Sequence, residues 1–293
     1  MSTTAGVFSE TLLQNVRIKA SMLAMDDRIN LQYKPEIETL KFIQAQQTAN
    51  IKPIFDVKKK KKIMEIWWEN ACGIEVADNV DCVVGGNELS TNVETYDLDI
   101  QKVAGFTVDE KKFYDNEAMI EENLAKGFLR ADKVLSEYLA QVGVGRLNTF
   151  LGVNTLTGGK GTVNGNLTEI NSAYWSADLM AYLNRVAIDN RIDNPIFLSG
   201  QNLYEAWWNA IRESGNDNGK GNAAKFGSAN IFFDLRNVDS VNSPDALTYM
   251  VQRGMIAMAS RTYYGSEVTD YMTEKRYSIP SNFVPGLSYD VHY

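Results

Sequence analysis

The chain has 293 residues, of which 44% are hydrophobic, and its formal net charge at pH 7 is -8. This length and composition allow one large folded domain or two smaller ones, and they exclude a disordered chain. The acidic balance argues against binding nucleic acid over the whole surface, because such binding depends on Lys and Arg side chains that neutralise phosphates.

The chain has a single histidine, His292, and this excludes several classes of active site. A Ser-His-Asp triad, a Cys-His pair and a multi-histidine metal site all need an imidazole in the folded body, whereas we expect His292 to lie in a solvated tail. We therefore expect no catalytic, cofactor-binding or metal-binding residues, and no enzyme activity.

The two cysteines, Cys72 and Cys82, are too few for a four-ligand zinc site, and their spacing does not match a CxxC motif. We expect two buried thiols, with a disulfide that closes a short loop as the alternative. The first thirty residues contain no continuous apolar segment, and no later stretch is long enough to span a membrane. The chain is therefore expected to be made in the cytoplasm without a membrane partner.

Residues 1–50 predict an N-terminal arm. Phe8, Leu12 and Val16 recur at helical spacing, and a second short amphipathic stretch covers Glu36 to Ala45. Neither stretch could bury much surface alone. We expect both to lie across the body of this chain or a neighbouring copy, which makes Phe8, Leu12 and Val16 candidate contacts between subunits.

Residues 51–108 predict a long two-stranded β-hairpin with a turn-rich tip at Gly85 to Asn87. Trp67 and Trp68 lie in its first apolar run. The returning run contains Val93, Leu98, Ile100 and Val103. A two-stranded hairpin is marginally stable alone in water, so Trp67 and Trp68 are expected to pack on the chain's own long helix or on a second subunit.

The hairpin carries a run of five lysines: Lys58, Lys59, Lys60, Lys61 and Lys62. A run of charge usually marks a solvated face, and no interleaved aromatic residues support single-stranded nucleic-acid binding. An alternative is pairing across a subunit boundary with acidic residues of the long helix, for which the candidates are Glu117, Glu121 and Glu122.

The strongest helical pattern runs from Asp109 to Gln141, where apolar residues form one stripe among charged ones. Asp109 is a suitable N-cap, and Gly143 with Gly145 is expected to end the helix. At 1.5 Å per residue, about 30 residues would span roughly 45 to 50 Å. Such a helix would act as a spine for the other elements.

The rest of the chain predicts a loop or short hairpin that joins two subdomains, followed by a compact part. Residues 152 to 168 are rich in Gly, Thr and Asn, and Gly158 to Thr162 is not a Walker A motif because Gly161 separates the lysine from the threonine. Residues 171–245 alternate helical and strand patterns, and residues 246–293 read as strands with turns at Pro280 and Pro285.

Two stretches resemble a known family. The sequence from Glu94 to Val108, ETYDLDIQKVAGFTV, leads straight into the Asp109 helix and is similar to the returning strand of the extended loop in tailed-bacteriophage major capsid proteins. The sequence from Asn194 to Ser199, followed by a helical stretch from Gln201, resembles a strand and helix of that family's axial subdomain. The order of the predicted elements over nearly the whole chain is also similar.

The resemblance implies an α+β capsid fold, the Johnson fold, with five parts: an arm (1–50), an extended β-hairpin loop (51–108), a spine helix with a peripheral subdomain (109–170), an α/β axial subdomain (171–245) and return strands (246–293). It implies a structural subunit that assembles into pentameric and hexameric capsomers of an icosahedral virion shell in the host cytoplasm. The shell would enclose double-stranded DNA without sequence-specific binding. Its expected partners are a portal and a separate scaffolding or decoration protein.

Two other functions remain open at this point. An encapsulin-like nanocompartment shell would share the fold and enclose a cargo protein. A carboxylate-based enzyme would use residues such as Asp78, Asp81 and Glu88, although Asp and Asn are common at turns for backbone reasons. Shell size, host and the redox state of the two cysteines have no signal in the sequence.

Overall fold

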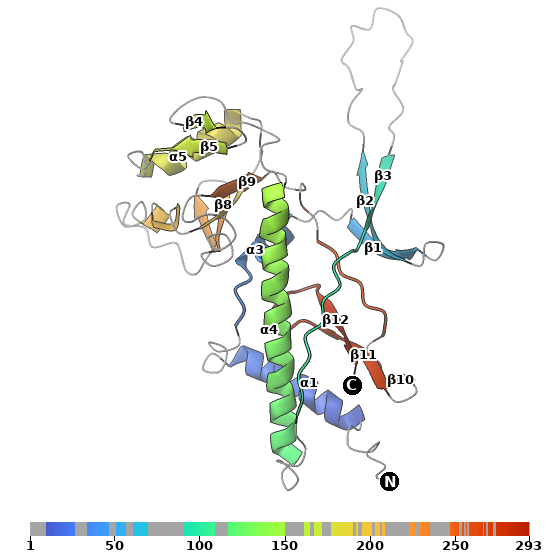
Figure 1. Ribbon diagram of the computed structural model, residues 1–293. Helices are drawn as coiled ribbons and strands as arrows, with labels where there is room; N and C mark the ends of the chain where they lie inside the picture. The colour runs from blue at the N-terminus through green and yellow to red at the C-terminus, as the bar shows by residue number, and fades with distance from the viewer. Residues whose placement is uncertain are drawn as a thin grey trace, which may run out of the picture.

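The computed structural model describes residues 10–26, 34–46, 51–56, 61–69, 91–108, 117–149, 161–164, 167–171, 177–189, 192, 195–200, 203–205, 207–208, 223–226, 229–234, 247–251, 254, 256, 258–265, 267, 269–271 and 274–292. These residues form an α+β arrangement in which small sheets surround one long helix (Figure 1). The predicted mixture of helix and sheet is confirmed.

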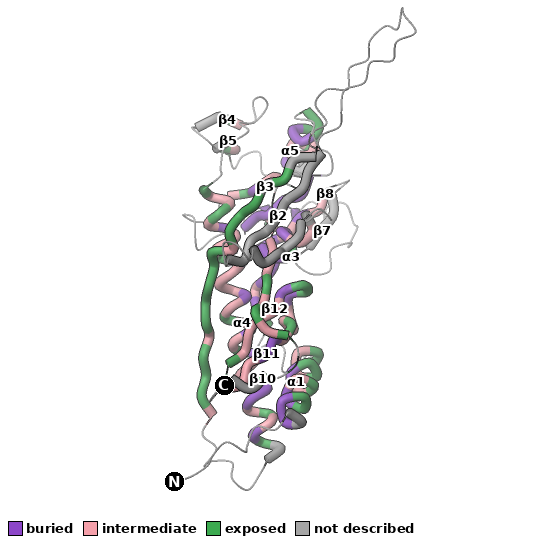
Figure 2. The backbone as a smooth tube through the Cα atoms, turned by 90° about the vertical axis from the view of Figure 1, so that its right-hand side faces the viewer, coloured by how far each residue is buried: buried purple, intermediate pink, exposed green. Residues whose placement is uncertain are grey.

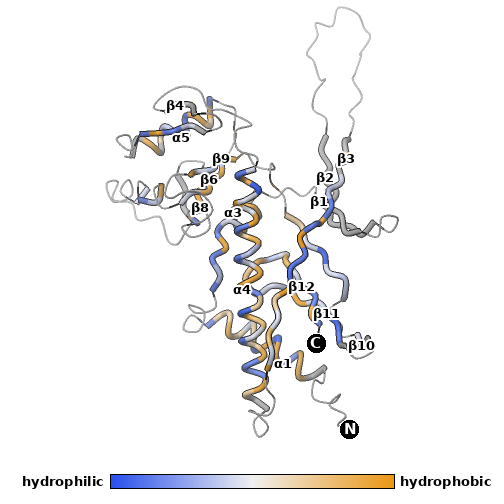
Figure 3. Tube along the Cα trace, in the orientation of Figure 1, coloured by the Kyte–Doolittle hydropathy of each residue, from blue (hydrophilic) through white to orange (hydrophobic). Residues whose placement is uncertain are grey.

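The described helices are amphipathic, and one is much longer than the others. They are α1 (Glu10–Met25), α3 (Glu38–Gln46), α4 (Glu117–Thr149) and α5 (Ala177–Asp189). At 1.5 Å per residue, the 33 residues of α4 span about 50 Å. Figure 3 shows hydrophobic and hydrophilic residues alternating along α4, as expected for a helix with apolar neighbours on some sides and solvent on others.

The described strands are short. They are β1 (Ile51–Asp56), β2 (Lys61–Glu69), β3 (Thr91–Asp97), β4 (Gly161–Asn164), β5 (Leu167–Ile170), β6 (Ile196–Ser199), β7 (Ala223–Phe226), β8 (Ala229–Phe233), β9 (Thr248–Val251), β10 (Thr269–Tyr271), β11 (Glu274–Pro280) and β12 (Ser288–His292). They form two antiparallel sheets, β1-β2-β3 and β10-β11-β12, an antiparallel pair, β4-β5, and a mixed sheet in the order β7-β8-β6-β9.

The mixed sheet carries the main core on both of its faces. Its central strand β6 is parallel to β8 and antiparallel to β9, and all four of its residues are buried. Because neighbouring side chains on a strand point to opposite faces, Ile196 and Leu198 join one core cluster and Phe197 joins another. The first cluster includes residues of α3, α4 and the C-terminal region, and the second includes Leu179 of α5 and Trp207.

The long helix continues past the glycines that were expected to end it. It runs through Gly143 and Gly145 to Thr149, so the predicted end near Gln141 is wrong. A Cβ at Gly143 would lie 3.0 Å from Cδ1 of Ile43 and 3.3 Å from Cγ2 of Thr39, both on α3. Gly143 therefore allows a close approach of α3 to α4, and the packing compensates for its low helix propensity. The expected N-cap, Asp109, lies outside the described residues.

The predicted returning strand is shorter than expected. β3 ends at Asp97, and residues 98–108 form an irregular segment that runs along α4 toward its N-terminal end (Figure 1). Leu98, Ile100 and Val103 were expected in the strand, and that expectation is wrong. The segment is instead held by α4: the Phe106 ring lies over Gly127 and packs edge-on against Phe128, with ring centroids 5.4 Å apart.

The predicted two-stranded hairpin is in fact a three-stranded sheet. β2 pairs on one side with β1, where Lys61 is opposite Asp56, and on the other with β3, where Trp67 is opposite Val93. The turn-rich tip at residues 70–90, with Cys72 and Cys82, lies outside the described residues. A third strand supplies β2 with backbone hydrogen-bond partners on both edges, which makes the sheet more stable than an isolated hairpin.

The N-terminal half of α4 lies between two other elements. Figure 2 shows the exposed segment 98–108 on one side of α4 and α1 on the other, with the buried face of α1 toward α4 and its exposed face turned away.

Within the described part of the chain, no helix is both long enough and apolar enough to span a bilayer.

Candidate functional site

The apolar contact between α1 and α4 buries two of the residues that the sequence singled out. Leu12 and Val16, 4% and 0% exposed, pack with Ala20 against α4 of the same chain. The α4 residues in this cluster are Ile120, Leu124, Ala125 and Leu129. A role for Leu12 and Val16 between subunits would require α1 to leave α4, and it stays a prediction. Phe8 lies outside the described residues.

Polar contacts reinforce the same helix pair. Glu121 forms an ion pair with Lys19 at 2.6 Å and accepts a hydrogen bond from the Asn15 side-chain amide at 3.1 Å. Both partners are on α1. These two contacts, the one from Lys19 being the larger, hold the pKa of the Glu121 carboxyl below its usual value. Glu122 is paired at 2.5 Å with Lys126, one turn further along α4, and its pKa is lowered for that reason.

These partners bear on the predicted pairing between the lysine run and the long helix. Glu121 and Glu122 each have a lysine partner in their own chain, and the side chain of Glu117 lies outside what the structure describes. Lys61 and Lys62 begin β2, and Lys58, Lys59 and Lys60 lie outside the described residues. Pairing between the lysine run and these acids in another subunit stays a prediction.

The outward side of α1 also carries apolar residues. Ile18, Met22 and Met25 are 54%, 65% and 83% exposed, and their i, i+4, i+7 spacing places them on one stripe of the helix. We call these three residues the outer stripe of α1. It lies opposite the buried residues Leu12 and Val16 on the helix circumference, because each residue advances the helix by about 100°.

A groove with a volume of about 760 Å³ lies between segment 98–108 and α4. We call it the α4 groove. Its lining residues are Val103, Ala104, Gly105, Phe106, Thr107 and Val108 on the segment, and Asn123, Lys126, Gly127, Arg130, Ala131 and Val134 on α4. Val103 is 95% exposed and Val134 is 57% exposed, so apolar side chains border the groove at its open side.

A buried carboxylate on α4 fixes the C-terminal region to the long helix. Asp132, 5% exposed, accepts hydrogen bonds from the Ser281 hydroxyl at 2.8 Å and from the Asn282 backbone N–H at 2.7 Å. The Ser281 Oγ in turn accepts from the backbone N–H groups of Phe283 and Val284. Asp132 therefore orients a short turn that packs against both α1 and α4.

The next turn, from Val284 to Leu287, has the residues that its geometry requires. The Leu287 N–H donates to the Val284 carbonyl at 3.2 Å, with Pro285 and Gly286 between them, and Gly286 has φ of +78°. Proline at the second position and glycine at the third are the preferred residues of a type II turn. The turn predicted at Pro285 is confirmed.

Tyr289 belongs to the same cluster. Burial is the main cause that raises the pKa of its hydroxyl well above the ordinary value, and the negative charge of Asp132 adds to the effect. Its hydroxyl also lies 3.2 Å from the Ser136 Oγ, one turn from Asp132 on α4.

The raised pKa of Tyr289 predicts a loss of stability at alkaline pH. A folded-state pKa above the unfolded value of about 10 stabilises the fold fully below pH 10, and this contribution falls as pH rises further. Relative to Tyr289→Phe, the wild type should lose about 1.4 kcal/mol of unfolding free energy between pH 9 and 11. Urea denaturation of both proteins at these pH values measures the difference, and Tyr263→Phe, at a residue that is 61% exposed, is the matched control. A constant difference between wild type and Tyr289→Phe would contradict the prediction.

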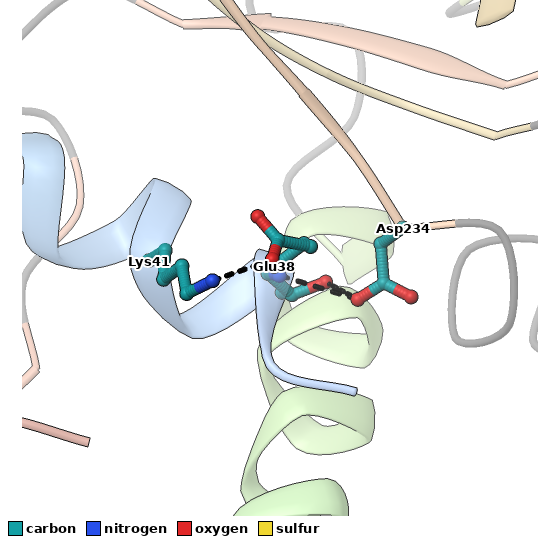
Figure 4. Close-up of polar contacts among 4 residues, drawn as sticks. Glu38, Lys41 and Asp234 are labelled. Atoms are coloured by element: carbon teal, nitrogen blue, oxygen red, sulfur yellow. Dashed lines mark hydrogen bonds and ion pairs between the residues drawn. The ribbon is translucent and has the colours of Figure 1, made fainter. Parts of the chain in front are cut away.

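A second buried carboxylate caps the short helix α3 (Figure 4). Asp234 follows β8, and its Oδ2 accepts hydrogen bonds from the Thr39 backbone N–H at 3.2 Å and from the Thr39 hydroxyl. An acceptor at this position satisfies a free N–H of the first helical turn and interacts favourably with the helix dipole. The Asp234 N–H donates to the Ser199 carbonyl at 3.0 Å, so the cap is held by the end of β6. Residues 38–46 are thus attached to the mixed sheet.

Sequence reasoning did not find Asp132 or Asp234. For Asp132 a signal exists, because Asp132 and Ser136 follow Phe128 at steps of four and so fall within the apolar stripe of the helix. A polar residue at a buried helical position needs a partner, although the sequence does not say which. Asp234 has no comparable local signal, because its partner Thr39 is 195 residues away.

Among the residues that the structure covers, no group of three or more His, Cys, Asp or Glu side chains is placed to hold a metal ion. The carboxylates considered for an enzyme, Asp78, Asp81 and Glu88, lie outside the described residues. The candidate functional sites among the described residues are two surfaces, the outer stripe of α1 and the α4 groove.

Comparison with known proteins adds no assignment: no family model, no curated protein and no solved structure matches the chain.

Proposed function

We propose that this protein is the structural shell subunit of a tailed double-stranded DNA bacteriophage, a major capsid protein with the Johnson fold. Copies of the chain would form pentameric and hexameric capsomers and close into an icosahedral shell. The shell would hold DNA without reading its sequence, together with a portal and a separate scaffolding or decoration protein.

The observation that carries this proposal is the arrangement of elements around α4. An N-terminal helix, an extended segment and a C-terminal turn all lie along one helix of 33 residues, and the mixed sheet lies near its C-terminal end (Figure 1). This order is the one expected for a spine helix between a peripheral and an axial part. A shell subunit also needs apolar surface left for its neighbours, and Ile18, Met22, Met25, Val103 and Val134 provide it.

Electron microscopy of the purified protein tests the proposal. We expect closed particles or capsomer rings, because many copies of one chain must meet through repeated equivalent contacts. Sedimentation velocity over a wide range of concentration is the control for assembly in solution. A single monomer peak at every concentration, with no particles or rings in the images, would contradict the proposal.

The contents of the particles separate the two shell functions. Nucleic acid or portal-bearing heads, from cells that also produce the other virion proteins, would support the capsid. Particles that instead hold one bound enzyme would show an encapsulin-like compartment and overturn the capsid assignment while leaving the shell fold in place.

A further inference from the structure

The α4 groove and α1 lie on opposite sides of the long helix. Glu121 contacts Lys19 and Asn15 on α1, and Arg130, which lines the groove, follows Glu121 by nine residues. At 3.6 residues per turn, nine residues make about two and a half turns, so the two side chains leave α4 in opposite directions. Figure 2 shows the same layering, with segment 98–108 and α1 on either side of α4.

The outer stripe of α1 therefore faces away from the groove. α1 buries Leu12 and Val16 on the side toward α4 and exposes Ile18, Met22 and Met25 on the side away from it. With α4 lying between them, the two surfaces cannot meet within one chain. Of the residues that the structure describes, neither surface can cover the other, so each can contact another molecule.

We propose that the outer stripe of α1 on one copy docks in the α4 groove of the next copy. The contact is heterologous, since it joins two different surfaces, and repeating it adds copies in one direction until a ring closes. This inference rests on the proposed shell function and specifies one of the contacts between subunits.

The chemistry of the two surfaces is complementary. The stripe is uncharged and contains two methionines, whose flexible side chains adapt to an irregular surface, and the groove presents Val103, Phe106 and Val134. The edges carry charges of opposite sign: Asp26 follows the stripe and Arg130 borders the groove. Lys126 borders the groove as well, but it is already paired with Glu122 of its own chain.

The size of the contact indicates how it would be used. A helix of 16 residues is about 24 Å long and about 10 Å wide, so its footprint is on the order of 240 Å². A stable complex of two proteins buries about 800 Å² on each partner. The contact alone would therefore not hold a dimer together at low concentration, and it would act in combination with other contacts in an assembly.

Cross-linking between different cysteine variants tests the docking directly. In a Cys72→Ser, Cys82→Ser background, Met22→Cys and Val103→Cys are made as separate proteins, and a short bismaleimide is added to each alone and to an equal mixture. We expect a covalent dimer in the mixture that is absent from either single variant. The protein that carries both substitutions should give a ladder of dimers, trimers and larger species, because each copy has both surfaces.

A matched control uses Ile188→Cys in place of Met22→Cys. Ile188 is 68% exposed on α5, which Figure 1 places far from α1. Its mixture with Val103→Cys should give no dimer. Equal yields from the two mixtures would show random collision and overturn the inference.

The reactions are run on concentrated subunits and on any particles that form, so the two proposals fail separately. Particles without the Met22 to Val103 cross-link would overturn the docking and leave the shell function in place. The cross-link without closed particles would support the docking and contradict the shell. If neither the cross-link nor any particle appears, both are wrong.

Discussion

Replacing Asp132 with alanine is expected to lower the free energy of unfolding by about 2 to 4 kcal/mol. The substitution removes the acceptor for the Ser281 hydroxyl and for the Asn282 N–H, in a region where Asp132 itself is 5% exposed. A buried donor without a partner costs more than the net value of the hydrogen bond that is lost, because it was desolvated on folding. Urea denaturation measures the change, and hydrogen exchange of the Asn282 amide locates it.

Asp132→Asn is the matched variant. An amide keeps one acceptor oxygen for the Asn282 N–H, but its NH₂ group cannot accept from the Ser281 hydroxyl, whose oxygen already accepts from Phe283 and Val284. We expect a loss of about 1 kcal/mol, smaller than that of the alanine variant. An alanine variant as stable as the wild type would show that the Asp132 network does not hold the C-terminal turn in solution.

Replacing Val16 with aspartate should detach α1 from α4. Val16 is fully buried in the cluster that also contains Leu124 and Leu129, and a carboxylate at that site would lose its hydration. Undocking the helix relieves this cost. We expect the amides of α1 to exchange on the order of 100-fold faster, which corresponds to about 2.8 kcal/mol of lost docking free energy.

Met22→Asp is the control on the same helix. Met22 is 65% exposed on the outer stripe, so a carboxylate there stays in water and should leave the exchange of α1 nearly unchanged. It should nevertheless weaken the docking of α1 in a neighbour's groove, because the apolar contact is lost. If Val16→Asp and Met22→Asp change the exchange of α1 equally, the assignment of inner and outer faces is wrong.

The sequence by itself indicated several of the helices and one of the strands. Apolar residues at helical spacing predict α1, α3 and most of α4, and the short run Pro195 to Leu198 predicts β6 to within a residue. These patterns depend on which face of a segment leaves water, and that information is local. Composition also showed a single histidine, His292, which was expected in a tail and which the structure places in β12, opposite Arg276 of β11.

Only the tertiary structure decided where each segment lies. Leu98, Ile100 and Val103 have the residue types of a strand, but the segment leaves the sheet after Asp97 and follows α4, where Phe106 packs over Gly127. Gly143 has the local signal of a helix end, yet α4 continues because α3 packs closely there. In both cases a contact between distant residues outweighed a local preference of about 1 kcal/mol or less.

The same distinction applies to the candidate site. The sequence placed Leu12 and Val16 on one face of a helix but could not say what covers them, and the structure gives α4 of the same chain as the answer. It also leaves Ile18, Met22 and Met25 on the opposite face in solvent. Which of two apolar faces is covered depends on the position of a helix about a hundred residues later in the chain, and periodicity within a single helix carries no information about that partner.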